Sequence, residues 1–224
     1  MALIELKNVF KVYESQAGSV TAVGGVSTSF EEGEFTAIVG PSGCGKTTLL
    51  NAIGGLDQPT QGEIHIDGVN IVALKDRNLI DFRLQHIGFV FQAYNLIPVL
   101  TALENTAFIL ELQGVGKKER DARAMELLEA VGLADRAHNR PNQLSGGQQQ
   151  RVAVARALAS RPRFVLADEP TANLDSKSTE TLLDIMAQLN DKEKTTFIFS
   201  THDQRVIDRA RRIIPLEDGK IKSV

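Results

Sequence analysis

The sequence lacks the features that mark several large classes of protein. Cys44 is the single cysteine among 224 residues, so no internal disulfide can form and a reducing, cytosolic compartment is expected. No apolar run approaches the ~20 residues that a membrane-spanning helix needs. The first residues also lack the cationic and apolar regions of a signal peptide. Any role at a membrane would therefore require a partner.

Basic residues are not in excess either. The chain has 25 Lys and Arg against 28 Asp and Glu, a formal net charge of -3. It therefore lacks the surplus of positive charge that a dedicated nucleic-acid-binding protein uses for phosphate contacts, and no nucleic-acid partner is expected. The length suits one large domain or two small ones, with room for a sizeable hydrophobic core.

What the sequence does contain is a glycine-rich turn between a buried strand (35–39) and a helix start (49–53). The turn reads Gly40, Pro41, Ser42, Gly43, Cys44, Gly45, Lys46, Thr47 and Thr48. Its glycines let successive backbone N–H groups point inward as a nest for an anion, and the positive end of the helix adds to that field. Lys46 is placed to reach the β and γ phosphates, and the Thr47 hydroxyl to reach Mg²⁺. The strand and helix around the turn favour a nucleoside triphosphate site over a chance glycine-rich turn.

Apolar patterns predict further strands and helices around this turn. Strands are predicted over residues 3–12, 20–30, 35–39, 62–71 (a hairpin), 87–91, 164–168, 195–200 and 212–222 (two short strands). Tyr13 is expected to end the first strand, before a loop over 14–19. Helices are predicted from Thr101, which forms a capping box with Glu104, and over residues 117–131 and 176–190. This order predicts an α/β fold with a mixed, mainly parallel core sheet, an antiparallel β layer and a helical subdomain.

An acidic pair follows one of the buried strands. Asp168 ends the run 164–168, which puts its carboxylate at the carboxyl end of a parallel strand, the edge where open α/β sheets bind ligands. We expect Asp168 to hold Mg²⁺ opposite Thr47, and Glu169 to polarise an attacking water. An isolated acidic pair would more simply be a solvated loop, so this interpretation depends on the phosphate-binding turn.

A second glycine-containing motif reads Leu144, Ser145, Gly146, Gly147 and Gln148. Ser145 is placed to cap a helix, and the glycines would let backbone N–H groups approach a phosphate, so the motif predicts a second anion site. Here the sequence resembles the ATP-binding cassette (ABC) family, whose signature is this pentapeptide. The resemblance covers essentially all of the chain, because the remaining family motifs occur in the family's order. It implies a P-loop NTPase fold and one nucleotide-binding domain over 1–224, with a RecA-like core and antiparallel layer at 1–92 and 159–224 and a helical signature subdomain at 93–158.

The resemblance also implies roles for single residues. Tyr13 matches the aromatic residue that stacks on adenine, and Gln92 the glutamine that touches Mg²⁺ and water. Asp168 matches the Mg²⁺ aspartate, Glu169 the catalytic glutamate, and His202 the histidine that contacts the γ-phosphate. The loop that crosses the dimer interface is matched by Asn173, Leu174 and Asp175. The implied cofactors are ATP and Mg²⁺, the latter held by Thr47, Gln92 and Asp168.

The family implies an ATPase that works as a pair. The turn at 40–48 and the motif at 144–148 cannot easily reach one γ-phosphate within a single chain if the second lies on a separate helical lobe. Two chains head to tail can bring them together, each supplying its signature in trans to its neighbour's ATP. ATP would then hold the dimer together, and hydrolysis to ADP and phosphate would release it.

Two stretches narrow the subfamily. Residues 89–105 and 168–175 are similar to those of macrolide-exporter and lipoprotein-release cassettes. The resemblance implies a cytoplasmic subunit, peripheral on the cell membrane, that powers a permease with few transmembrane helices and a large extracytoplasmic domain. Lipoprotein, drug or peptide would move outward. The alternatives are a soluble ABC-type switch in DNA repair or translation, which the acidic charge balance disfavours, and an importer ATPase.

Two further expectations concern the surroundings of the site. Residues 93–103 form a mixed apolar stretch next to Gln92, in which a short permease helix could dock; Tyr94→Ala or Leu96→Asp would then weaken contact with the permease. The alternative is that these are ordinary core and loop residues. Cys44 lies inside the phosphate-binding turn, so ATP is expected to protect its thiol from alkylation.

Overall fold

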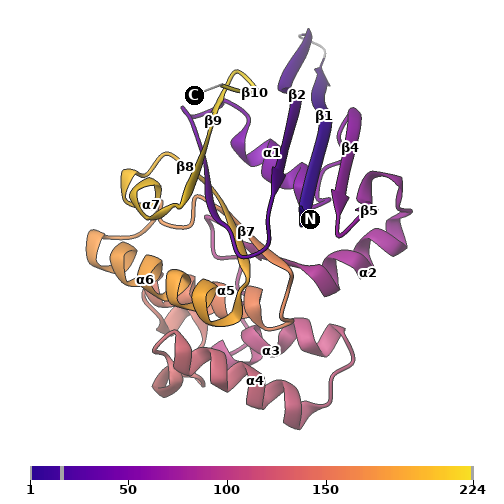
Figure 1. Ribbon diagram of the computed structural model, residues 1–224. Coiled ribbons are helices and arrows are strands. Elements are labelled where there is room, and N and C mark those ends of the chain that lie inside the picture. Colours follow the sequence, from indigo (N-terminus) through magenta and orange to yellow (C-terminus); the bar gives the residue numbers. More distant parts are fainter. Residues whose placement is uncertain (1, 16–17, 223–224) are drawn as a thin grey trace.

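The strands form two sheets that pack together through a shared core (Figure 1). The computed structural model describes residues 2–15 and 18–222. Within these ranges, the first sheet consists of β2 (Gly18–Phe30), β1 (Ile4–Ser15), β4 (Gln61–Ile66) and β5 (Val69–Asn70), in that spatial order and all antiparallel. The second sheet consists, in spatial order, of β10 (Lys220–Ile221), β9 (Arg212–Glu217), β3 (Phe35–Val39), β8 (Thr196–Thr201), β7 (Phe164–Asp168) and β6 (Ile87–Val90). Only β10 pairs antiparallel in this second sheet as described.

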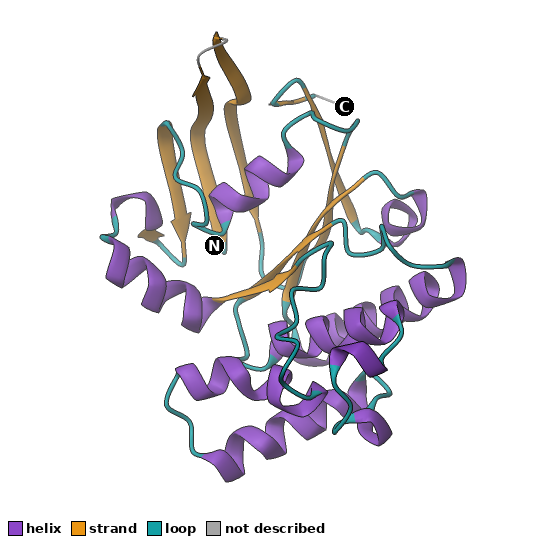
Figure 2. Cartoon of the chain, turned by 180° about the vertical axis from the view of Figure 1, so that it is seen from behind, coloured by secondary structure: helices purple, strands orange, loops and turns teal. Residues whose placement is uncertain are grey.

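Helices cover both faces of the second sheet. They are α1 (Lys46–Ile53), α2 (Asp76–His86), α3 (Ala102–Leu112), α4 (Lys117–Ala130), α5 (Gly146–Leu158), α6 (Ser176–Glu193) and α7 (Gln204–Arg209), with short 3₁₀ turns at Ile71–Ala73, Ala134–Arg136 and Pro141–Gln143. Figure 1 shows α3 and α4 at the end of the molecule opposite the antiparallel sheet, and Figure 2 shows the same layers from behind. The helix α3 packs on α4 and α5, and α5 also packs on β6 and α6, so α5 joins the outer helices to the sheet.

The strand residues separate into two hydrophobic cores because successive side chains point to opposite faces. Ile38 and Ile198 face a core that contains Leu49 of α1 and the inner side of the antiparallel sheet. Ala37 and Phe199 face the other core, which contains residues of α3, α4, α5 and α6. This arrangement confirms the predicted α/β fold with its mixed core sheet and antiparallel layer. The division of the chain at residues 92 and 159 stays a prediction.

The parallel register brings three strand ends to one edge. Val39 at the end of β3 lies beside Thr201 at the end of β8, and Asp168 at the end of β7 lies beside Ser200. The strand order 3-8-7 therefore places the phosphate-binding turn, the acidic pair and the segment before His202 next to one another.

Three details differ from the sequence predictions. The strand β1 does not end at Tyr13 but continues to Ser15, because its pairing with β2 extends to the tip of the hairpin; residues 16 and 17 of the predicted loop lie outside the described residues. Helix α2 was not predicted because it buries only Leu79 among its residues and so has little apolar periodicity. Helix α7 is a six-residue helix capped by Asp203, too short to produce a periodic pattern.

Candidate nucleotide site

The phosphate-binding turn depends on glycines at several of its positions. A Cβ atom at Gly40 would lie 2.1 Å from the carbonyl oxygen of Leu216, and one at Gly45 would lie 2.1 Å from that of Ala22. Gly43 has open space around it but a φ of +80°, which other residues rarely adopt. The turn is therefore fixed both by close backbone packing and by left-handed backbone geometry.

Lys46 is the buried cation at the centre of this turn. Its ammonium donates to the carbonyl oxygens of Gly40 and Pro41, at 2.8 and 2.9 Å. Both acceptors belong to the same turn, and Lys46 is also the first residue of α1. The turn thus concentrates a side-chain charge and the positive end of a helix at one point, which suits a polyanion.

A hydroxyl and a carboxylate meet beside the turn. The Thr47 hydroxyl donates to Asp168 Oδ1 at 2.9 Å, and the Ser200 hydroxyl donates to the same oxygen at 2.7 Å. Hard oxygen ligands of this kind are what Mg²⁺ binds in proteins, so the donor set fits that ion. Sequence reasoning missed Ser200, because only the pairing of β7 with β8 puts it beside Asp168.

Glu169 and His202 also lie together. His202 Nδ1 is 2.7 Å from Glu169 Oε1, and the imidazole is largely exposed whereas the carboxylate is mostly covered. Glu169 has a left-handed φ of +43°, and its N–H donates to the carbonyl of Ser200 at 2.9 Å. A backbone conformation of this kind is uncommon outside glycine and is frequent at functional sites.

One hollow of about 330 Å³ collects most of these groups. It is lined by Ala22, Ser42, Gly43, Gly45, Lys46, Thr47, Thr48, Gln92, Glu169 and His202. Ala22 comes from the antiparallel sheet and was not predicted. The predicted residues of the turn, the glutamine, the glutamate and the histidine are therefore brought to one place.

Tyr13 is not among these lining residues, but it lies on an exposed part of β1 within hydrogen-bonding reach of Thr48, which does line the hollow. Its hydroxyl donates to Asp57 Oδ2 at 2.6 Å, and the Lys11 ammonium lies 4.9 Å from the ring centroid. The hydrogen bond to Asp57 raises the pKa of Tyr13, because it favours the protonated hydroxyl. Lys11 and Asp57 thus hold the ring in place, and neither carries a local sequence signal.

The pentapeptide 144–148 does not line the hollow. Ser145 caps α5 by accepting from the Gln148 N–H at 3.3 Å, and the Gln148 side chain accepts from the Ser145 N–H at 2.8 Å. A Cβ atom at Gly146 would lie 2.8 Å from the Tyr94 hydroxyl, so the Tyr94 side chain would have to shift to admit a larger residue there. The structure confirms the predicted helix cap and leaves this second motif apart from the first within one chain.

The loop 173–175 lies between the hollow and the pentapeptide 144–148, next to Gln92 and Gly146. The Asn173 amide donates to the Gln92 carbonyl at 3.0 Å. Asp175 caps α6 by accepting from the Ser178 N–H at 2.9 Å, and this hydrogen bond lowers the pKa of Asp175. Asp175 therefore has a structural task as well as a position in the predicted interface loop.

The structure bears on two expectations about neighbouring residues. Cys44 is buried in the core around α1, 5% exposed, and does not line the hollow. Its thiol is therefore little exposed to an alkylating reagent, and its protection by ATP stays a prediction. An apolar groove of about 320 Å³ does lie beside Gln92, lined in part by Asn95, Ile97 and Ile109. Tyr94 and Leu96 do not line this groove, and Leu96 packs against the core instead, so substitutions there would disturb packing.

Comparison with known proteins identifies the family. The family described as ABC transporter matches residues 23–172. The chain belongs to the ABC transporter family. An ABC transporter ATP-binding protein of Thermotoga maritima is 50% identical over 222 residues, which cover 99% of this chain and 94% of that protein. The lipoprotein-releasing system ATP-binding protein LolD of Bacteroides fragilis is 45% identical, over 98% of this chain and 100% of that protein.

Other relatives extend this picture. The macrolide export ATP-binding/permease protein MacB of Hyphomonas neptunium is 48% identical over 99% of this chain, which matches 34% of that longer protein. A solved structure of the ATP-binding cassette MJ0796 of Methanocaldococcus jannaschii, dimeric and bound to ADP and Pi, superposes with a TM-score of 0.91. It is 46% identical, over 98% of this chain and 97% of that chain.

These findings confirm the predicted activity and cofactors at the level of the family. The ABC protein described here is an ATPase, and ATP with Mg²⁺ is what its site uses. Lys46 and the glycine-rich turn fit the phosphates by charge and shape, and the oxygens of Thr47 and Asp168 fit the ion. Bound Mg²⁺ supplies neutralisation of the phosphate charge.

Proposed function

We propose that this ABC ATPase powers a separate permease that moves or extracts a lipoprotein, drug or peptide outward. The observation that carries the proposal is the match to LolD, which extends over nearly the full length of both chains. The similarity to MacB, a macrolide exporter by name, points in the same direction. No helix in the described ranges is both long and apolar enough to cross a membrane. Through the proposed permease, the chain would sit on the cytoplasmic face of the membrane.

The catalytic unit would be a head-to-tail pair of chains. The hollow collects the groups that are proposed to bind the phosphate end of ATP, while residues 144–148 lie outside it. Ser145 and the start of α5 offer a second positive helix end for the same phosphates, and a neighbouring copy could bring it there. The related MJ0796 cassette is itself dimeric in its solved structure.

The side chains divide the chemistry among them. Lys46 would neutralise charge on the β and γ phosphates, and Thr47, Asp168 and Gln92 would hold the metal ion. Glu169, with its covered carboxylate, would accept a proton from the attacking water. His202 lies within hydrogen-bonding distance of Glu169 and would contact the γ-phosphate, which fixes the carboxylate beside the bond to be broken.

Substitution of the proposed general base tests this assignment. In Glu169→Gln the amide keeps the size of the side chain but cannot take the proton, so phosphate release should fall by roughly 10²-fold or more. ATP binding should remain, and an ATP-dependent dimer should accumulate because hydrolysis no longer dissolves it. Phosphate-release assays and size-exclusion chromatography with and without Mg-ATP measure the two effects. A Glu169→Gln protein that stays monomeric and fully active would contradict both.

The apolar groove beside Gln92 is the proposed docking site for the permease. Ile97, Phe108 and Ile109 give it an apolar lining suited to one face of an amphipathic helix. A charge placed there should weaken that contact, so Ile109→Glu should reduce recovery of the permease with the ATPase from detergent-solubilised membranes. Leu112→Glu, on the same helix but already exposed, is the matched control and should recover the permease normally. Equal recovery with both variants would rule out this groove.

A further inference from the structure

The segment that follows Gln92 has an unfavourable backbone. Tyr94 and Asn95 are consecutive, and both adopt left-handed conformations, with φ of +54° and +50°. For residues other than glycine this costs about 1 kcal/mol each or more, although asparagine tolerates it better. Two such residues in succession persist only where surrounding contacts over-determine them. The contacts that hold Tyr94 and Asn95 therefore decide where Gln92 stands.

Arg156 on α5 supplies those contacts. Its guanidinium donates to the carbonyl oxygens of both residues, at 2.6 Å to Asn95 and 2.9 Å to Tyr94. The described residues provide no carboxylate partner for Arg156, and burial lowers the pKa of its guanidinium. Arg156 is half-buried, so its cation loses part of its hydration, and its two carbonyl acceptors are the main compensation.

The same segment touches α5 again near the start of that helix. The Tyr94 hydroxyl lies where a Cβ atom on Gly146 would be only 2.8 Å away. Gly146 and Arg156 are separated by about 15 Å along the helix axis. At its other side, the Gln92 carbonyl accepts from Asn173. The segment 92–95 therefore lies along α5, the helix that begins with the signature motif. Among the described residues, Arg156 is the only side chain of α5 that forms hydrogen bonds with this segment.

We infer that Arg156 is a positioning residue that fixes Gln92 relative to the signature helix α5. The planar guanidinium holds two adjacent carbonyls at once, so α5 and the segment carrying Gln92 move as one body. Loss of the two hydrogen bonds from Arg156 would let Tyr94 and Asn95 relax toward ordinary backbone conformations. The Gln92 side chain would then move away from the hollow. The inference rests on the proposed role of Gln92 as a metal contact.

Metal affinity in the nucleotide complex tests the inference without relying on turnover. The probe is Mn²⁺ binding to the ADP complex, measured by electron paramagnetic resonance. Arg156→Met should weaken Mn²⁺ binding by roughly tenfold, which is the smaller of the losses in metal affinity seen when a residue that orients a metal ligand is changed. The affinity for metal-free ADP should stay unchanged. Arg151→Met is the matched control: Arg151 lies on the same helix and donates to the Val131 carbonyl, away from Gln92. Arg151→Met should leave Mn²⁺ affinity at the wild-type value.

Hydrogen exchange gives a second readout. Peptides covering residues 91–97 should exchange faster in Arg156→Met than in Arg151→Met. If Arg156→Met does not fold, Arg156→Lys keeps the charge, can reach only one carbonyl at a time and should show the same changes in weaker form. A uniform rise in exchange over the whole chain in either Arg156 variant would indicate a merely structural role and would overturn the inference.

Gln92→Ala separates the inference from the proposal beneath it. If Gln92→Ala and Arg156→Met each weaken Mn²⁺ binding and the double variant is no weaker than Gln92→Ala alone, the two act through one contact and the inference stands. If Gln92→Ala weakens Mn²⁺ binding but Arg156→Met matches Arg151→Met, the inference is wrong and the role of Gln92 is kept. If Gln92→Ala has no effect, the proposed metal role of Gln92 is wrong and the inference falls with it.

Discussion

At the scale of single residues, Asp203 ties together the two loops that carry Glu169 and His202. It follows His202 directly, and its carboxylate accepts from the Thr171 hydroxyl at 2.9 Å. The Arg205 guanidinium donates to both of its oxygens, at 2.9 and 2.7 Å. These bonds from Arg205 lower the pKa of Asp203 from 3.8 to about 2. The carboxylate is mostly covered, so the charged form is favoured in the folded protein.

The depressed pKa predicts how stability depends on pH. A group whose pKa is lower in the folded state stabilises that state above its unfolded pKa and loses this effect as the pH falls through the folded pKa. Asp203 should therefore contribute about 2 kcal/mol at most above pH 4, vanishing toward pH 2. Urea unfolding of Asp203→Asn should show a deficit at pH 6 that shrinks below pH 4. Asp135→Asn, which changes an exposed carboxylate, is the control. A deficit that stays constant from pH 6 to pH 2 would contradict this assignment.

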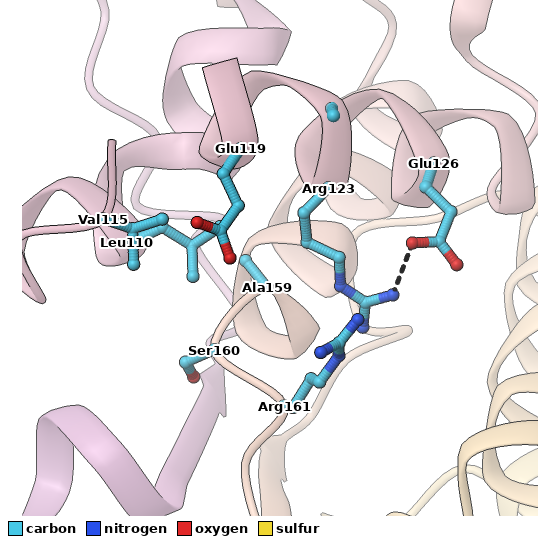
Figure 3. A pocket seen from close by; sticks show the side chains of 9 residues that line it. Leu110, Val115, Glu119, Arg123, Glu126, Ala159, Ser160 and Arg161 are labelled. Carbon is cyan, nitrogen blue, oxygen red and sulfur yellow. Dashed lines mark hydrogen bonds and ion pairs between the residues drawn. The ribbon is translucent and has the colours of Figure 1, made fainter. Parts of the chain in front are cut away.

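At the scale of whole elements, Arg123 joins three helices at the outer end of the molecule. It projects from α4 into a hollow of about 330 Å³, toward Arg161 and Glu126 (Figure 3). Its guanidinium donates to Glu126 at 2.9 Å and to Glu193 of α6 at 2.8 Å, and more weakly to the carbonyl of Leu158, which ends α5. The arginine side chain is only 9% exposed, so these bonds are largely shielded from water.

Loss of this arginine should weaken the attachment of α4. In Arg123→Met the apolar stem remains, but Glu193 is left largely buried without its cation, which should lower the free energy of unfolding by about 2 kcal/mol. Arg136→Met provides the control, because Arg136 is half exposed and, within the described residues, pairs with its neighbour Asp135 alone. Urea unfolding followed by circular dichroism compares the two. Equal unfolding midpoints for both variants would mean that the hydrogen bonds of Arg123 do not stabilise the attachment of α4.

Elements with a strong local pattern could be predicted, and those held mainly by tertiary contacts could not. The buried strands, the helix at 117–130 and the capping box at Thr101 follow from apolar periodicity and cap residues within a few positions of each other. Helix α2 buries a single residue and gave no such pattern. The extension of β1 beyond Tyr13 depends on its pairing with β2, and Tyr13 and its neighbours show no apolar alternation that would indicate it.

At the scale of the whole molecule, strand order is what the sequence could not supply. The turn at 40–48 and the pair Asp168-Glu169 could be recognised as motifs, but Ser200 and Ala22 join them only because β8 lies between β3 and β7 and β2 lies beside the turn. Arg156 was invisible for the same reason, since its acceptors are backbone carbonyls some sixty positions away. A ligand-binding motif can be recognised because its residues are close together in the sequence. The residues that hold such a motif in position come from distant parts of the chain, so no local pattern identifies them.

The separation of the two anion motifs predicts that active sites are shared between chains. Lys46→Ala should disable the turn in both sites of a dimer, and Ser145→Arg should disable the signature in both, so each variant alone should be inactive.

In a head-to-tail dimer each site combines the turn of one chain with the signature of the other. A mixed dimer would therefore contain one site with both defects and one site with neither. Random mixing should then restore about a quarter of the wild-type sites, measurable as phosphate release in a single turnover. A mixture of Glu169→Gln and Lys46→Ala chains is the control. Both residues are proposed to belong to the same chain's half of a site, so each site of a mixed dimer carries one of the two changes and no activity should return. Recovery in this control mixture would mean that Glu169 acts in trans, against the proposed arrangement. No recovery in the Lys46→Ala plus Ser145→Arg mixture, when size-exclusion chromatography shows that mixed dimers form, would contradict the head-to-tail arrangement.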